Sequence, residues 1–447
     1  MIKPELIEFL KRVISDRFET EKQNKKTALA VFPVLKPRES VLSDFIIDNR
    51  LDSNETVVLL LSIVPHILPD FLNKIVFLHF PNGGDFAEFG GVKGKNHRGV
   101  LPTGETVLYI LAGNDLEKRI EVSRLFDEDH LFAQKNILYL DAVERGEPRM
   151  SGKLVLEDDY IDLFTTGIIS KPRLSADFPA ERIATGLEWT DLVLQEKTLE
   201  SIHEIEIWLK HNEKLLNDWN LKHKIKPGFR VLFYGPPGTG KTMTACLLGK
   251  YTRRDVYRID LSTVVSKYIG ETEKNLSKLF DKAANKDWIL FFDEADAIFG
   301  KRTGVRDAHD KYANQEVSYL LQRIESHAGL VILASNMKGN IDPAFTRRFN
   351  SIIEFDNPGI NERLRLWQNY IPEGKTDKTV NIKEIAQKYE ITGANIVNAL
   401  HFAGLRTFEK RSTAISPDDL MEGIEKEYQK EGKIFLKPEI LKFKSKR

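Results

Sequence analysis

The chain has 447 residues, which is too long for a single ordinary hydrophobic core and suits two or three domains. Charged residues make up 30% of it and balance to a formal net charge of zero, so the composition indicates neither a nucleic-acid partner nor an anionic membrane. Its single cysteine, Cys246, excludes an internal disulfide framework and favours a reducing, cytoplasmic location.

The N-terminal segment, residues 1–170, is expected to be an α+β domain that binds a substrate or a partner. Its first residues mix acids and bases among apolar positions, which favours an amphipathic helix over a secretory signal. The most apolar run, 57–71, is too short to span a bilayer and is expected to be a buried helix. Apolar periodicity predicts helices near 3–18 and 55–72, a helix from Thr103 or Glu105 to Gly113, and strands at 75–80 and 136–143.

Residues 171–185 contain two prolines and are expected to be a linker, after which the pattern changes. From 186 to 356, short apolar runs alternate with helical patterns. The runs predict strands at residues 230–234, 255–260, 288–292, 329–335 and 351–355. Continuous apolar strands separated by helices predict an α/β fold, with a five-stranded parallel sheet that is covered on both faces.

The C-terminal part of the sequence is helical. Residues 357–430 show only helical patterns and predict a small all-α lid domain. Residues 431–447 are expected to be a basic tail, because the segment from Lys430 to Arg447 holds seven lysines and arginines against two glutamates. Such a tail is expected to be solvated, and contact with an acidic partner is the alternative.

A glycine-rich loop follows the first of the five strands directly. It consists of Gly235, Pro236, Pro237, Gly238, Thr239, Gly240, Lys241 and Thr242. A strand before it and a helix after it are the context that a phosphate-binding loop requires, because its backbone N–H groups and the helix N-terminus bind phosphate oxygens. Lys241 can reach the β- and γ-phosphates of ATP, and Thr242 can bind Mg²⁺. The sequence therefore predicts a P-loop NTPase.

Three acidic residues, Asp293, Glu294 and Asp296, follow the strand at 288–292. Carboxylates at the carboxyl end of a buried parallel strand lie where an open α/β sheet binds its ligands. Asp293 is predicted to hold the metal ion through water, and Glu294 to act as a base toward the attacking water. An acidic pair after a strand is also a common helix start, but the phosphate loop favours the catalytic interpretation.

Four motifs together resemble the AAA family of ATPases, over about residues 186–430. They are GPPGTGKT, ILFFDEAD, the asparagine of LASN and the RRF of AFTRRF. The resemblance implies that Asn336 positions the attacking water and that Gly393 and Ala394 of the lid lie near the nucleotide. The residue after this glycine and alanine is usually acidic in the family, whereas here it is Asn395.

Two adjacent arginines, Arg347 and Arg348, precede the last predicted strand. The family resemblance implies that they act as fingers on the γ-phosphate held by a neighbouring subunit of a hexameric ring. A guanidinium placed there is worth about 10³ to 10⁵ in turnover, so catalysis would depend on assembly of a homo-oligomer. A solvated basic pair is the alternative.

An aromatic residue stands in the polar stretch SKYIGETEKN, and its neighbourhood is Lys267, Tyr268, Ile269 and Gly270. In the AAA family the aromatic residue at this place lines the central pore and grips an extended polypeptide. A tyrosine suits that role because its flat ring contacts any chain at little rotamer cost. The alternative is that Tyr268 and Ile269 pack on the start of the next helix. A second pore element is expected at residues 300–311, where solvated charges are the alternative.

These expectations favour an ATP-driven motor that remodels, unfolds or disassembles protein substrates. A nucleotide-switched assembly factor that threads nothing and a DNA-associated ATPase are the alternatives, although neutral charge argues against nucleic acid. Residues 149–167 resemble the winged-helix-like region that precedes the ATPase in a group of bacterial AAA proteins. Some of those proteins are encoded beside contractile injection systems, so the resemblance suggests a component of such a system as partner.

Overall fold

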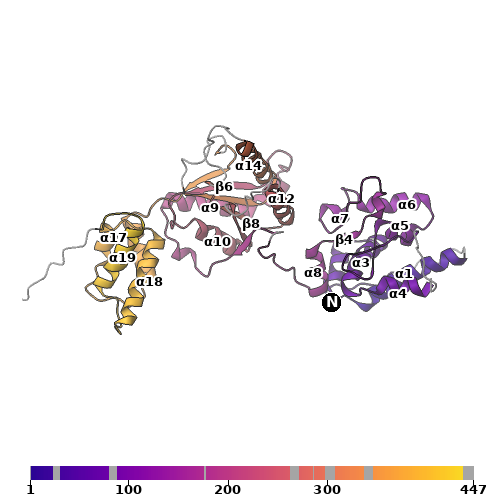
Figure 1. Cartoon of the computed structure of the whole chain (residues 1–447), viewed down its shortest axis with the longest axis horizontal. Helices are drawn as coiled ribbons and strands as arrows, with labels where there is room; N and C mark the ends of the chain where they lie inside the picture. Colours follow the sequence, from indigo (N-terminus) through magenta and orange to yellow (C-terminus); the bar gives the residue numbers. More distant parts are fainter. Residues whose placement is uncertain are drawn as a thin grey trace, which may run out of the picture. The chain divides into compact units, whose positions relative to one another are not determined.

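The computed structural model describes residues 2–23, 31–79, 88–175, 178–261, 271–284, 286–296, 308–336 and 346–435. The chain divides into two compact units, residues 1–171 and 172–447, and each is described by itself (Figure 1).

The first unit is mostly helical and has two small antiparallel sheets. Its helices are α1 (Pro4–Gln23), α2 (Val41–Asp48), α3 (Ser53–Ile67), α4 (Phe71–His79), α5 (Gly104–Ala112), α6 (Leu116–Ser123), α7 (Leu131–Gln134) and α8 (Asp158–Thr166). The sheets pair β1 (Val92–Lys93) with β2 (Val100–Leu101), and β3 (Leu138–Leu140) with β4 (Leu154–Leu156). This mixture agrees with the α+β class expected for the N-terminal part.

Helix α3 forms the centre of the first unit's core. Every residue from Thr56 to Val64 is buried, as expected of a helix that is apolar all round and enclosed by protein. A capping box fixes its start, because Asp52 and Glu55 each accept the other's backbone N–H. Among the described helices none is long and apolar enough to cross a membrane by itself; α3 and α4 reach that length and composition only together, across a bend of 108°.

The prediction of a strand at residues 75–80 is wrong, because residues 75–79, the described part of this segment, lie in α4. Phe71 and Ile75, one helical turn apart, are buried while Phe77 is exposed, which is the one-sided burial of a helix. A short apolar run carries too little periodicity to separate the two structures. The helix expected near 3–18 is confirmed as α1, and the one from Thr103 to Gly113 is confirmed as α5, with these two residues as its caps. The helix expected near 55–72 is only partly confirmed, because α3 ends at Ile67 and α4 begins at Phe71.

The second unit is built on a six-stranded sheet. Five parallel strands confirm the predicted sheet: β6 (Phe229–Tyr234), β7 (Val256–Asp260), β8 (Ile289–Asp293), β9 (Leu330–Ser335) and β10 (Ser351–Glu354). Their order is β10-β6-β9-β8-β7. A sixth, antiparallel strand, β5 (Glu181–Ile183), lies beside β7 at the edge, within the segment that was expected to be only a linker.

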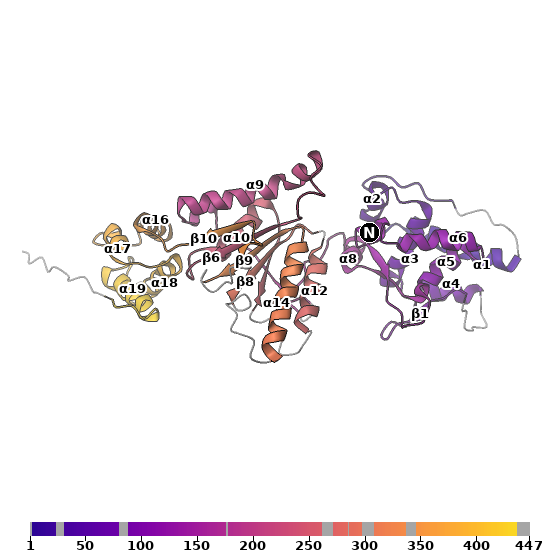
Figure 2. The same cartoon turned by 90° about the horizontal axis from the view of Figure 1, so that it is seen from above.

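Helices cover both faces of this sheet, and in Figure 2 they lie on opposite sides of the strands. They are α9 (Glu196–Asp218) and α10 (Lys241–Thr252) on one face, and α12 (Glu271–Ala283) and α14 (Ala308–Ser326) on the other. The strands alternate between the two cores. On β8, Ile289 and Phe291 pack with α9 and α10, whereas Leu290 and Phe292 pack with α12 and α14.

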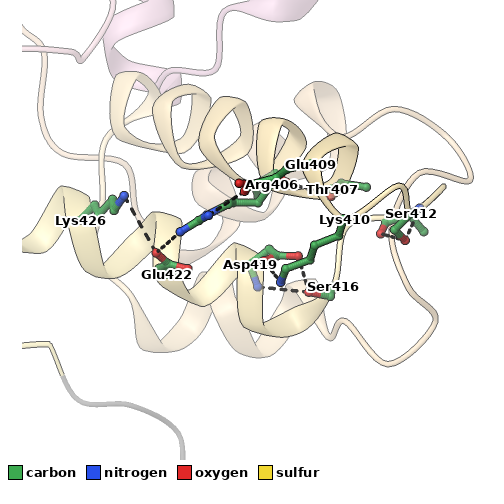
Figure 3. Close-up of polar contacts among 11 residues, drawn as sticks. Arg406, Thr407, Glu409, Lys410, Ser412, Ser416, Asp419, Glu422 and Lys426 are labelled. Carbon is green, nitrogen blue, oxygen red and sulfur yellow. Dashed lines mark hydrogen bonds and ion pairs between the residues drawn. The ribbon is translucent and has the colours of Figure 1, made fainter.

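The lid domain of the second unit is helical, as its sequence predicts. Its helices are α16 (Ile360–Tyr370), α17 (Ile382–Lys388), α18 (Gly393–Glu409) and α19 (Pro417–Lys430). They enclose a core of their own around Trp367, which is fully buried. Ion pairs such as Arg406 with Glu409 and Lys410 with Asp419 line the α18–α19 side (Figure 3).

Candidate active site

The phosphate-binding loop connects the end of β6 to the start of α10. Gly238 has a φ of +76°, in the region that favours glycine, and a side chain there would collide with the lid. An added Cβ would lie 2.7 Å from the Ala394 Cβ and 2.8 Å from the Thr392 hydroxyl oxygen. The Ala394 N–H donates to the Gly238 carbonyl at 3.4 Å. Gly238 therefore permits both the loop's conformation and its contact with the first turn of α18.

Lys241 is buried behind this loop. Its ammonium group donates to the Gly235 carbonyl at 2.6 Å and to the Pro236 carbonyl at 3.0 Å, and it lies 3.4 Å from the Asn336 side-chain oxygen. Burial lowers the pKa of Lys241, and the negative charge of Asp293 opposes that shift. The loop carbonyls thus hold a cation at the carboxyl edge of the sheet, where an anionic ligand would be bound.

The acidic residues and the asparagine come from the ends of neighbouring strands. Asp293 is the last residue of β8, and Asn336 directly follows β9. Glu294 has a φ of +52°, which is uncommon for a residue with a side chain, and its backbone N–H donates to the Asp293 carboxylate at 3.1 Å. Its own side chain is exposed. A base at this position would be free to approach water from the solvent side.

A cavity of about 510 Å³ joins these residues to the lid. Predicted site residues line its phosphate end: Pro237, Gly238, Thr239, Gly240, Lys241, Thr242, Asp293, Asn336, Gly393 and Ala394. Gly235, Pro236 and Glu294 are adjacent to this set but do not line the cavity.

The other end of the cavity was missed by the sequence analysis. Its apolar lining residues are Leu192, Val193, Leu194, Leu366, Tyr370 and Val397, and polar residues such as Asp191, Asp356, Glu362 and Asn398 also line the cavity. The first three form an extended segment whose alternate side chains enter different cores: Leu192 and Leu194 pack with the sheet domain, and Val193 packs with the lid. An apolar slot next to a phosphate loop fits a nucleoside.

The two arginines do not reach this cavity. Ser351, the first residue of β10, pairs with Val231 near the start of β6, whereas the phosphate loop follows the end of β6. Phe355, whose N–H donates to the Tyr234 carbonyl at the end of β6, lies four residues beyond Ser351, about 13 Å along the strand. Arg347 is exposed, and Arg348 forms an ion pair with Glu325 at 2.5 Å. Both therefore lie at the opposite edge of the sheet from the phosphate loop.

The expected pore residues Lys267, Tyr268, Ile269 and Gly270 lie outside the described residues, as does most of the expected second pore element. Their roles stay predictions.

Comparison with known proteins identifies the domain around the cavity. The family model "ATPase family associated with various cellular activities (AAA)" matches residues 231–357. A proteasome-activating nucleotidase of Aeropyrum pernix is 31% identical over 239 residues, which are 52% of this chain and 58% of that protein. Cell division protein C of Sulfolobus acidocaldarius is 30% identical over 49% of this chain and 63% of its own length. The 26S proteasome regulatory subunit 6A of Encephalitozoon cuniculi is 31% identical over 60% of this chain and 66% of its own length.

The chain thus spans less than two thirds of the length of each of these relatives. The family match covers most of β6 and its phosphate loop, the acids after β8 and Asn336 after β9, but not Gly393 and Ala394 of the lid. It supports ATP hydrolysis as the activity of this domain. Residues 231–357 are an AAA ATPase domain with the P-loop fold of that family.

Proposed function

We propose that the chain is an ATP-hydrolysing motor that assembles as a homo-oligomer, with six subunits in the ring, and remodels protein substrates. The observation that carries this proposal is the separation of Arg347 and Arg348 from the cavity of their own subunit. A chain that holds its phosphate loop at one edge of the sheet and its arginines at the other can complete the site only with a second copy.

Within one subunit, the lining residues fit ATP with Mg²⁺. The backbone N–H groups of the phosphate loop and Lys241 would bind the phosphates, while Thr242 and Asp293 would hold the metal ion. Bound Mg²⁺ neutralises charge on the phosphates during transfer. Asn336, close to Lys241, would orient the attacking water, and Glu294 would accept its proton.

The arginines would complete this site in trans. A guanidinium from the neighbouring subunit stabilises the charge that develops on the γ-phosphate, which is the step that assembly would license. Both arginines are exposed, and Arg347 is the candidate for that contact because Arg348 is already paired with Glu325. Hydrolysis in one subunit would therefore depend on the position of the next.

The substrate class follows from the aromatic loop and from the relatives. Tyr268 would contact an extended polypeptide in the centre of the ring, without reading its sequence. Two of the relatives are named for the proteasome and one for cell division, and each matches about half of this chain or somewhat more. The choice of partner would then lie with the N-terminal unit, and a component of a contractile injection system is one partner that the sequence suggests.

Partner trapping tests this proposal. The Glu294→Gln chain should bind ATP, hydrolyse it slowly and retain its protein partners, which cross-linking and mass spectrometry would identify. Adding Tyr268→Ala should release those partners, while Tyr268→Ala alone should leave ATP turnover near the wild-type rate.

Lys241→Ala is the control, because it should abolish ATP binding and the trapping together. Retained ATP binding by Lys241→Ala would refute the phosphate assignment. Partners that persist in the Tyr268→Ala background would instead favour a nucleotide-switched assembly factor that does not thread its substrate.

A further inference from the structure

Helix α19 of the lid buries two carboxylates that face α18. Glu427 is 4% exposed and Asp419 is 2% exposed, and each is paired with a lysine at 2.5 Å, Lys430 and Lys410 respectively. Asp419 also accepts a hydrogen bond from the hydroxyl of Ser416, the N-cap of α19, at 2.7 Å, so it takes part in capping its own helix (Figure 3). Glu427 differs because its second oxygen is directed to two asparagines of α18.

Those asparagines are held in one orientation by charge. The Glu427 Oε2 atom lies 3.1 Å from the Asn395 Nδ2 and 3.2 Å from the Asn398 Nδ2. An ionised carboxylate only accepts hydrogen bonds, so both amides must turn their N–H₂ groups toward it. Burial by itself would raise the pKa of Glu427, but hydrogen bonds from Lys430 and the two amides outweigh it and lower the pKa.

The side-chain oxygens of Asn395 and Asn398 differ in whether they accept a hydrogen bond. The Asn395 oxygen accepts the Thr392 N–H at 3.0 Å, in the capping box that begins α18. Asn398, by contrast, is exposed toward the cavity that it lines, and no hydrogen bond among the described residues occupies its oxygen. A fixed hydrogen-bond acceptor is therefore available at the cavity wall.

The position of Asn398 relates this acceptor to one part of the ligand. Helix α18 meets the phosphate loop at Ala394, and Asn398 lies one turn further on, about 6 Å along the helix. The next residue before it, the apolar Val397, also lines the cavity, as does the cationic Lys241 beside the phosphate loop. A nucleotide with its phosphates at the loop would place its nucleoside further along the cavity, and the position of Asn398 one turn beyond Ala394 fits a contact with that part.

We propose that Asn398 is a specificity-determining residue that accepts a hydrogen bond from the nucleoside of bound ATP, and that Glu427 is the positioning residue that orients it. The proposal rests on the function proposed above. The nucleoside offers two kinds of donor, a ribose hydroxyl and the adenine amino group. Nucleotides that lack one donor at a time distinguish them.

Exchanging charges gives a sharp prediction. In Glu427→Gln, Lys430 would select the amide oxygen, so the new N–H₂ group would face the two asparagines. The Asn398 N–H₂ group would then lose the oxygen that accepts its hydrogen bond. If the amide flips, its oxygen faces the new N–H₂ group and its own N–H₂ group faces the cavity. Asn398→Asp alone places a second carboxylate beside Glu427, but combined with Glu427→Gln it restores both the contact and an oxygen at the cavity wall.

The experiment measures dissociation constants of the full-length chain for ATP, 2′-deoxyATP, 3′-deoxyATP and purine riboside triphosphate, which lacks the amino group. Wild type should bind one of the three analogues about 3- to 10-fold more weakly than ATP, as expected for one hydrogen bond. Glu427→Gln should weaken ATP binding by a similar factor and lose that discrimination, with kcat nearly unchanged. Asn398→Asp with Glu427→Gln should recover both within about twofold.

Asp419→Asn is the matched control, since it breaks a buried pair on the same helix away from the cavity. It should lower the melting temperature without changing nucleotide affinity. The inference is overturned if Glu427→Gln discriminates like wild type, if the double variant shows no recovery, or if Asp419→Asn weakens ATP binding equally. A wild type that binds no ATP would overturn the proposed function itself, and this inference with it.

Discussion

The two edges of the ATPase sheet carry different parts of one chemical apparatus. At the carboxyl ends of the strands, Lys241, Asp293 and Asn336 line one cavity. At the amino edge, Arg347 and Arg348 are exposed on a turn before β10. In the proposed mechanism, ATP binding is completed within one subunit, whereas the arginines that would stabilise the transferred phosphate of a neighbouring subunit are exposed on the surface.

A buried arginine, Arg230, holds the turn that carries the two exposed arginines. Arg230, at the start of β6, is 5% exposed and donates to the Pro227 carbonyl at 2.9 Å and the Glu325 carbonyl at 3.1 Å. Its backbone N–H and its Nε also donate to the Asn350 side-chain oxygen, at 2.9 and 3.1 Å. One buried guanidinium thus joins the end of α14, the start of β6 and the turn that carries the arginines.

The largest effect should come from removing the arginines, and mixing two variants then tests whether they act on a neighbouring subunit. Replacing Arg347 and Arg348 by alanine should lower turnover by about 10³-fold or more while ATP binding persists. Subunits that lack both arginines keep the cavity, and subunits with Lys241→Ala keep the arginines, so mixed oligomers should regain part of the hydrolysis that each lacks alone. Steady-state ATPase rates over a range of mixing ratios measure this, and rates that stay at the sum of the two inactive proteins would exclude action in trans.

A somewhat smaller effect is expected at the carboxyl edge. Glu294→Gln removes the base but keeps the size of the side chain, so turnover should fall by about 10² to 10⁴-fold with little change in ATP affinity. Single-turnover hydrolysis and nucleotide binding separate the two quantities. Glu325→Gln is a useful counterpart, because it neutralises an acid at the amino edge and should leave affinity for ATP unchanged. Ordinary turnover in Glu294→Gln would remove this residue from the proposed mechanism.

The carboxyl edge was largely predictable from the sequence, and the reasons are local. A glycine-rich loop after an apolar strand, and acids at the end of another, signal their chemistry within a few residues. Parallel pairing then brings Lys241, Asp293 and Asn336 together, because the carboxyl ends of parallel strands meet at one edge. The strands themselves were predictable because both of their faces are buried.

The nucleoside end and the support of the arginines were not predictable in this way. Leu192 and Tyr370 meet at one cavity although the whole sheet separates them in sequence, and apolar residues carry no motif. Arg230 reads as an ordinary charged residue at a strand start, and only its position reveals that its hydrogen bonds are buried. Asn395 departs from the usual acidic residue, and the carboxylate that it contacts, Glu427, comes from another helix.

The buried support at the amino edge offers an intermediate effect. Arg230→Met keeps the length and apolar stem of the side chain but leaves the Pro227 and Glu325 carbonyls unpaired, which should destabilise the chain by about 1 to 3 kcal/mol. The Asn350 side chain would lose the hydrogen bond from Nε but keep the one from the backbone N–H of residue 230, so turnover should fall by at most about tenfold while ATP affinity stays the same. Lys226→Ala is the control, since Lys226 is an exposed partner of the same Glu325. Equal losses in both variants would contradict a specific role for Arg230.

The smallest effect is a pH dependence that belongs to the amino edge. His327 lies between α14 and β9, where burial and the adjacent positive charge of Arg323 lower its pKa to about 4. A histidine in an unfolded chain has a pKa near 6.5. Between that pH and about pH 4, the unfolded chain therefore binds a proton at His327 that the folded chain does not. The free energy of unfolding should therefore fall by about 2 kcal/mol between pH 8 and pH 5 on this account alone. In denaturant unfolding, the free energy of unfolding of the wild type should fall on acidification relative to that of His327→Phe, and parallel curves would show that the imidazole does not control this pH dependence.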